Sequence, residues 1–116
     1  MNYSEPNICA VTNSTVIIPC SFYFPNGLTV KEVMWSNNKD YFYHGPFIYK
    51  SKDNTSSKFE YIGDKEQNCS LKIHKVEKKD AGEYAFRFET NSEPDKMTGL
   101  PGSKLKVVGK LSFSLF

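Results

Sequence analysis

Short runs in which apolar and polar residues alternate recur along this chain, and that period of two is the feature that most constrains its fold. Side chains two apart on a strand point to the same face, so each run has one face suited to a core. Turn-forming residues separate the runs, and no stretch keeps a helical period. The inward-facing sets are Val16, Ile18, Cys20 and Phe22; Val33 and Trp35; Phe59 and Tyr61; Cys69, Leu71 and Ile73; Tyr84, Phe86 and Phe88; and Leu105 and Val107. The pattern predicts an all-β antiparallel sandwich.

The chain has the length and composition of a single domain. Its 116 residues include 39% hydrophobic and 15% aromatic residues, which is enough for one core. The last alternating run ends near Val108. We therefore expect one domain over residues 1–108, followed by a C-terminal extension of unknown role over residues 109–116.

Three landmarks narrow the type of sandwich. Trp35 lies fifteen residues after Cys20, where an immunoglobulin sandwich buries its tryptophan. The set Asp80-x-Gly82-x-Tyr84 is typical of the tyrosine corner of such domains. Lys58 and Asp80 have the spacing of an ion pair that V-type domains place beneath the sheet. Together these landmarks predict an immunoglobulin V-type sandwich.

The three cysteines, Cys9, Cys20 and Cys69, depart from the usual immunoglobulin pattern. The position two residues after the corner tyrosine, normally the second cysteine, is Phe86. Cys69 is the only partner of suitable spacing for Cys20, on a neighbouring strand of the same sheet, where cross-strand Cβ atoms approach disulfide reach. We expect an intra-sheet disulfide Cys20–Cys69, with Phe86 filling the space between the sheets. Cys9 is left over, which suggests either a bond to another domain or chain, or a free buried thiol.

Arg87 is the only arginine among fifteen basic residues. It alternates with Phe86 and Phe88, so it faces away from the core. A guanidinium fork there can take a carboxylate through two parallel hydrogen bonds, which lysine cannot do. The alternative is an exposed arginine in a surface ion pair with Glu89 or Glu83.

Several segments resemble the N-terminal V-type domain of the sialic-acid-binding immunoglobulin-like lectins, the siglecs. They are Ile18-Pro19-Cys20-Ser21-Phe22, Asn68-Cys69-Ser70-Leu71 and Phe86-Arg87-Phe88-Glu89, within a similarity that spans about residues 6–108. The resemblance implies that the disulfide lies within one sheet and that Arg87 binds the carboxylate of sialic acid. It departs from the family at Thr15, where a cysteine is usual, and at or beside Met97, where a tryptophan usually contacts the glycerol tail.

The resemblance also implies further ligand contacts. Met97 would offer an adaptable apolar contact, and Tyr3 is the candidate for a second aromatic contact from the first strand. Backbone groups from Met97 through Thr98 to Leu100 would bond the amide and hydroxyls of the sugar. The tyrosine-rich loop with Tyr41 and Tyr43 would touch the next sugar; the alternative is an edge strand paired in the sheet.

Asn-x-Ser/Thr sequons begin at Asn2, Asn13, Asn54 and Asn68, and four in this length favour glycosylation of a secreted or cell-surface chain. The net charge of +2 forms no basic stripe for nucleic acid, and no apolar run is long enough for a membrane helix. His44 and His74 have no metal-ligand spacing, and no catalytic pattern is present. We therefore expect neither an enzyme nor a metal or cofactor site.

These observations predict an extracellular receptor or adhesion domain, part of a larger membrane receptor, that binds terminal sialic acid on glycans through Arg87. One alternative is a V-type domain that binds a cell-surface protein through the sheet face carrying Arg87, its GFCC′ face, with Tyr41, Phe42 and Tyr43 as anchors. Another is a receptor for anionic lipid head groups, with Arg87 again the anion ligand.

Overall fold

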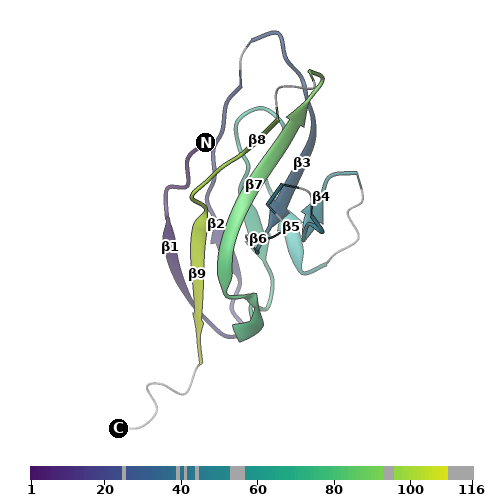
Figure 1. Ribbon diagram of the computed structural model, residues 1–116. Helices are drawn as coiled ribbons and strands as arrows, with labels where there is room; N and C mark the ends of the chain where they lie inside the picture. Colours follow the sequence, from purple (N-terminus) through teal and green to yellow (C-terminus); the bar gives the residue numbers. More distant parts are fainter. Residues whose placement is uncertain are drawn as a thin grey trace, which may run out of the picture.

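The computed structural model describes residues 1–24, 26–38, 40, 42–43, 45–52, 57–92 and 96–109. Its strands form two sheets packed face to face (Figure 1). The larger sheet has the order β1 (Asn7–Val11), β9 (Ser103–Val108), β7 (Gly82–Thr90), β3 (Val30–Ser36) and β4 (Tyr49–Lys50), with β8 (Lys96–Thr98) also paired to β7. The smaller sheet has the order β2 (Val16–Ile18), β6 (Leu71–Ile73) and β5 (Phe59–Tyr61). The predicted all-β sandwich is therefore confirmed.

The inward-facing sets meet between the sheets, as the alternation predicts. Trp35 and Phe86 are fully buried in the core, and the indole N–H of Trp35 donates to the Cys69 carbonyl at 2.9 Å. The Phe86 ring lies 5.0 Å from that of Phe22 and 6.2 Å from that of Tyr61, both from the smaller sheet or its flanks. Phe86 thus fills the inter-sheet space where the sequence lacks a cysteine.

The Cys20–Cys69 disulfide is present and joins the ends of two strands of one sheet. β2 and β6 are antiparallel neighbours, and the Cα atoms of the two cysteines are 4.9 Å apart. Beside the disulfide, the Cys69 N–H donates to the Cys20 carbonyl at 3.0 Å. Cys9 is free and exposed on β1, so the expectation of a buried thiol is wrong.

Both predicted features around Asp80 are confirmed. The Tyr84 hydroxyl donates to the Asp80 carbonyl at 2.6 Å, which closes the tyrosine corner. Asp80 is buried at the end of the 3-10 turn η2 (Lys78–Asp80), and its Oδ2 lies 2.8 Å from Lys58 Nζ. Burial acts to lower the pKa of Lys58, but hydrogen bonds to Asp80 and Glu77 outweigh it and raise that pKa.

The N-terminal segment passes from one sheet to the other. Asn2 pairs with Ser21 beside the smaller sheet, and five residues later β1 runs parallel to β9 in the larger sheet. Tyr3 lies at this crossing, against the core. The crossing brings the N-terminus beside the connection from β8 to β9 (Figure 1).

Candidate functional site

Four of the sequence-predicted site residues meet around one hollow of about 330 Å³, which we call the β8–β9 hollow. They are Tyr3, Met97, Thr98 and Leu100. The other lining residues are Met1, Pro6, Gly99, Pro101 and Gly102. The sequence did not indicate that Met1 and Pro6 line the hollow, because their position depends on the crossing of the N-terminal segment between the sheets. The residues from Gly99 to Gly102 do indicate a strand break in the sequence.

Arg87 reaches this region from β7 through Thr98. The two residues are directly opposite in the β7–β8 ladder, and Arg87 Nη1 donates to Thr98 Oγ1 at 2.9 Å. The next ladder hydrogen bond, from the Gly99 N–H to the Phe86 carbonyl, makes Arg87–Thr98 a non-hydrogen-bonded pair, in which side chains are closest. The same geometry directs the N–H and C=O of Thr98 to the outer edge of the sheet.

The sheet face around Arg87 is more covered than the alternation suggests. The Arg87 side chain is 12% exposed, and its Nε lies 3.5 Å from Glu89 Oε2. That contact is an ion pair and not a hydrogen bond, and the buried Nε has no hydrogen-bond partner among the described residues. Glu89 is the acid that the surface ion-pair alternative named, but the arginine is largely buried rather than exposed.

Two residues near Arg87 are buried as well. Met34, opposite Arg87 on β3, is 1% exposed. Phe42, from the segment after β3, is 4% exposed, and its carbonyl accepts a 3.4 Å hydrogen bond from the Thr98 hydroxyl. The guanidinium therefore lies beside Thr98 of β8, whose hydroxyl also bonds to Phe42, and it is mostly buried instead of lying on an open surface.

Tyr3 has an internal role that the sequence did not indicate. Its hydroxyl accepts from the Phe86 N–H and donates to the Gly99 carbonyl, each at 2.9 Å. Its ring lies 6.1 Å from that of Trp35. Burial is the largest cause that raises the Tyr3 pKa to about 12. Tyr3 thus bridges β7 to the β8–β9 connection, and both backbone groups of Gly99 are already paired.

The structure places Met97 and Arg87 on different faces of the sheet. Met97 is opposite Phe88, which points into the core, whereas Thr98 is opposite Arg87. Met97 and Leu100 are 50% and 45% exposed. A ligand that contacts both the hollow and the guanidinium must therefore wrap around the edge strand β8.

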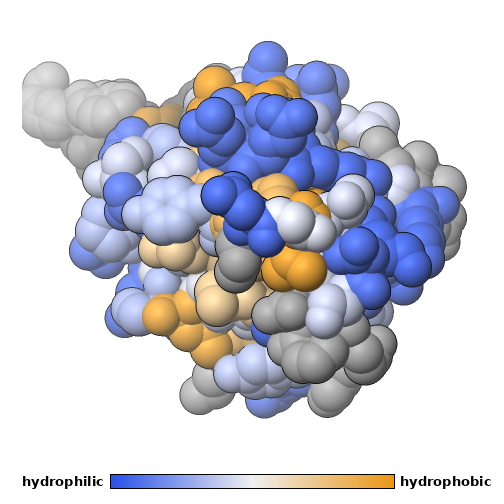
Figure 2. Space-filling model, turned by 90° about the horizontal axis from the view of Figure 1, so that it is seen from above, coloured by the Kyte–Doolittle hydropathy of each residue, from blue (hydrophilic) through white to orange (hydrophobic). Residues whose placement is uncertain are grey.

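The remaining predicted residues are spread over the surface. Tyr43 is 58% exposed, while Tyr41 lies outside the described residues. Asn2, Asn13 and Asn68 are exposed, and Asn54 lies outside the described residues. Figure 2, which views the upper end of the molecule in Figure 1, shows small apolar areas separated by hydrophilic ones.

Within the described part of the chain, no cluster of three or more metal-ligating side chains is found. Likewise, none of the described helical segments has the length and apolarity that a membrane crossing requires.

Comparison with known proteins supports the fold and identifies the family. The model of the family described as B-cell receptor CD22-like, first Ig-like, matches residues 10–109. The chain is similar to the structure of Tim-1, with 19% identity, a TM-score of 0.65 and 95% of each chain covered. It is also similar to human T-cell immunoglobulin and mucin domain protein 1, with 17% identity, a TM-score of 0.70, and 89% of this chain and 97% of the other covered.

A third similar structure is that of Dpr1 IG1 bound to DIP-eta IG1, with 20% identity, a TM-score of 0.65 and 90% of each chain covered. At these identities the three structures support the fold alone. The family model spans most of the chain, from β1 to the end of β9. The chain therefore belongs to the family of CD22-like first Ig-like domains, a type of receptor immunoglobulin domain.

Proposed function

We propose that this domain is the ligand-binding unit of a cell-surface receptor and that it binds terminal sialic acid on glycans through Arg87. The observation that carries the proposal is the Arg87–Thr98 pair at the edge strand β8. Beside it lie exposed Met97 and Leu100 at the β8–β9 hollow. Carboxylate, amide and apolar parts of one sugar would thus find matching groups within a short stretch of chain.

The carboxylate would use the guanidinium and the Thr98 hydroxyl together. Thr98 Oγ1 accepts from Nη1 of Arg87, and its own proton is directed to Phe42 only through a long hydrogen bond of 3.4 Å. Rotation of that hydroxyl offers a donor to an incoming carboxylate without loss of the arginine contact. In the described chain, Arg87 Nη2 has no protein partner, so it supplies a second, charge-assisted donor.

The rest of the sugar would bind along the edge of β8. The outward N–H and C=O of Thr98 fit the amide and hydroxyls, and Met97 and Leu100 fit the apolar parts. Because Arg87 is mostly buried, we expect weak affinity for each copy. Many copies on a membrane would give useful avidity.

Arg87→Lys tests this proposal because it keeps the charge and removes the planar fork. We expect loss of sialoside binding in a glycan array and by NMR titration. Lys106→Ala, which removes an exposed charge on β9, is the matched control and should bind as the wild type does. Unchanged binding by a folded Arg87→Lys variant, or no sialoside binding by the wild type, contradicts the proposal.

A second candidate is a protein ligand, and two observations favour it. The guanidinium is largely covered, whereas Tyr43 beside Phe42 is 58% exposed and can act as an aromatic anchor. A similar domain, Dpr1 IG1, was solved bound to DIP-eta IG1. Sialidase treatment of target cells separates the candidates: binding is lost if the ligand is sialic acid and kept if it is a protein or an anionic lipid.

A further inference from the structure

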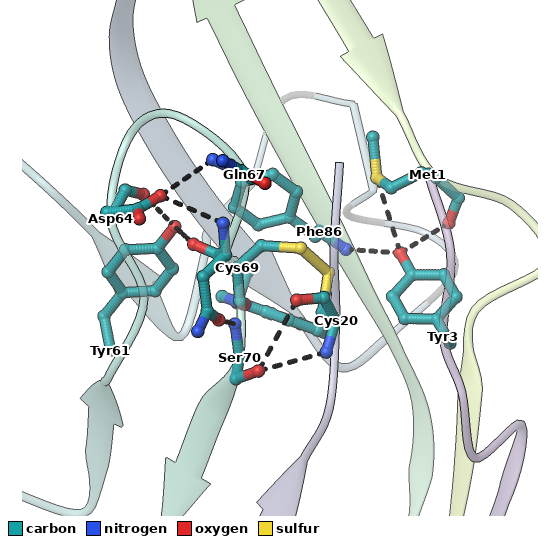
Figure 3. The surroundings of a disulfide bond; sticks show 12 residues. Met1, Tyr3, Cys20, Tyr61, Asp64, Gln67, Cys69, Ser70 and Phe86 are labelled. Atoms are coloured by element: carbon teal, nitrogen blue, oxygen red, sulfur yellow. Dashed lines mark hydrogen bonds between the residues drawn. A yellow bond between two sulfur atoms is a disulfide. The ribbon is translucent and has the colours of Figure 1, made fainter. Parts of the chain in front are cut away.

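The sequon Asn68-Cys69-Ser70 overlaps the disulfide, both in sequence and in its hydrogen bonds. Its middle residue is one half of the Cys20–Cys69 bond. Its hydroxyl residue is held by the other half, because Ser70 Oγ accepts a hydrogen bond from the Cys20 N–H at 3.1 Å. Figure 3 shows Ser70 directed at Cys20 beside the bond between the two sulfur atoms.

The backbone of Asn68 is held equally firmly. Its N–H donates to Asp64 Oδ1 at 2.9 Å, and its carbonyl accepts from the Tyr61 hydroxyl at 3.0 Å. Its side-chain Oδ1 accepts the Ser70 N–H at 2.9 Å. Only the side-chain nitrogen Nδ2, the atom to which a glycan would be attached, lacks a hydrogen-bond partner within the described residues, and Asn68 is exposed. A glycan on Asn68 therefore fits the finished fold, but the rest of the sequon is not free to move.

The sequon at Asn13 provides an internal comparison. Its hydroxyl residue, Thr15, is exposed, and no cysteine lies among residues 13–15. The Ser14 hydroxyl bonds to the carbonyl of Val11, in its own turn, and the backbone of Asn13 and Ser14 pairs with Val76 at the end of the smaller sheet away from the disulfide. Unlike Ser70, none of the groups of this sequon bonds to Cys20 or Cys69 among the described residues, so closure of the disulfide does not engage its hydroxyl residue directly.

We propose that folding controls modification at Asn68: a glycan is added there only before Cys20 and Cys69 join, and chains that close the disulfide first stay unmodified at that site. A sequon requires a Ser or Thr because the transferring enzyme must contact its hydroxyl as well as the asparagine. In the folded chain, contact with the Ser70 hydroxyl requires breaking its hydrogen bond to the Cys20 N–H and opening the end of the β2–β6 ladder.

The two competing reactions are both ordinary chemistry of the secretory route. In the first, Asn68 Nδ2 loses a proton and forms a bond to the anomeric carbon of an oligosaccharide, while the bond from that carbon to a lipid diphosphate breaks. In the second, the two thiols lose two protons and two electrons to a disulfide-bearing oxidant, which is reduced to a dithiol. Whichever occurs first decides the state of Asn68.

The test is site-specific glycopeptide mass spectrometry on the whole chain, expressed with a secretion signal in eukaryotic cells. Total cell protein is measured, so that retained chains are counted. We expect lower occupancy at Asn68 than at Asn13 in the wild type. Cys20→Ser, which leaves the sequon itself intact, should raise occupancy at Asn68 and leave Asn13 unchanged.

A second arm uses the wild-type chain in cells treated with a mild thiol reductant, which delays closure without any substitution and should give the same selective rise. The proposal is overturned if occupancy at Asn68 equals that at Asn13 and neither arm changes it. It is also overturned if Asn68 stays unmodified in every arm, or if both sites rise together.

Discussion

At the scale of single residues, Tyr3 shows how one hydroxyl completes a ladder between strands. β7 pairs with β9 at Tyr84 and with β8 at Arg87, and the Phe86 N–H falls between these two sets. The Tyr3 hydroxyl accepts a hydrogen bond from that N–H and donates one to the Gly99 carbonyl. Buried backbone groups are rarely left unpaired, so this side chain replaces a missing strand partner.

Tyr3→Phe tests this role. The change keeps the ring against Trp35 and leaves the Phe86 N–H and Gly99 C=O without a partner, so we expect a loss of about 1–3 kcal/mol in the free energy of unfolding. Urea denaturation at pH 7 measures the loss. Because the folded pKa is raised from 10.0 to about 12, the hydroxyl contributes fully below pH 10 and its contribution disappears as the pH rises toward 12. Equal stability of the two proteins at pH 7 would falsify this role.

Asp64 gives a second prediction at the residue scale, in acid. Its Oδ1 accepts N–H groups from Glu66, Gln67 and Asn68, and the bonds from Gln67 and Asn68 are the largest causes that lower its pKa from 3.8. A lowered folded pKa gives stability that is present above pH 3.8 and lost as the pH falls through the folded value. Asp64→Asn should therefore weaken the chain at pH 7 and make its unfolding less dependent on pH below 4. Parallel pH profiles for the two proteins contradict this.

At the scale of elements, the disulfide joins β2 to β6 within the smaller sheet, and among the described residues no disulfide links one sheet to the other. In the larger sheet, the segment that pairs with β7 is divided into two strands. β8 and β9 are separate strands on either side of Gly99–Gly102, and this break makes room for Tyr3 and for the β8–β9 hollow. The geometry of the candidate site is thus set at the break between β8 and β9.

Reduction of Cys20–Cys69 should lower stability without separating the sheets. The bond closes a loop with a sequence separation of 49 residues, for which the chain-entropy model gives about 4 kcal/mol. Urea unfolding of the oxidised chain and of a Cys20→Ala, Cys69→Ala double variant measures the difference. We expect the double variant to keep its near-UV spectrum below the transition, since Trp35 and Phe86 still pack together. Loss of that spectrum in water shows that the bond, not the core, holds the sandwich.

At the scale of the whole molecule, an aromatic core holds the two sheets together. Phe86 is fully buried and its ring faces Phe22, Trp35 and Tyr61. Such ring pairs stabilise the fold by more than their buried area alone provides.

The predicted domain boundary after Val108 coincides with the end of β9, and it remains a prediction.

Phe86→Ala should therefore cost about 3–5 kcal/mol, as other large aromatic-to-alanine changes in cores do. Ala85→Gly, one residue away and outside the aromatic cluster, is a milder control on the same strand. Thermal unfolding followed by tryptophan fluorescence reports the change, because Trp35 lies 5.7 Å from the Phe86 ring. A similar small effect of both substitutions means that the sheets do not depend on this ring.

The sequence alone determined the sandwich, the pairing of Cys20 with Cys69, and the pairs Lys58–Asp80 and Tyr84–Asp80. The sandwich and the disulfide follow from alternation and from the pairing geometry of neighbouring strands. The two pairs at Asp80 follow from the immunoglobulin landmarks in the sequence. The family resemblance also named Tyr3, Met97, Thr98 and Leu100; these four residues line one hollow, and their role in ligand binding remains a prediction.

Only the tertiary structure decided how those residues act. The Tyr3 hydroxyl bonds to a residue 96 positions away, and the Thr98 hydroxyl to one 56 positions away. Contacts at such separations depend on how loops and strand ends pack, and no periodicity records them. That is why the burial of Arg87, and the placing of Met97 on the opposite face, could not be predicted from the chain.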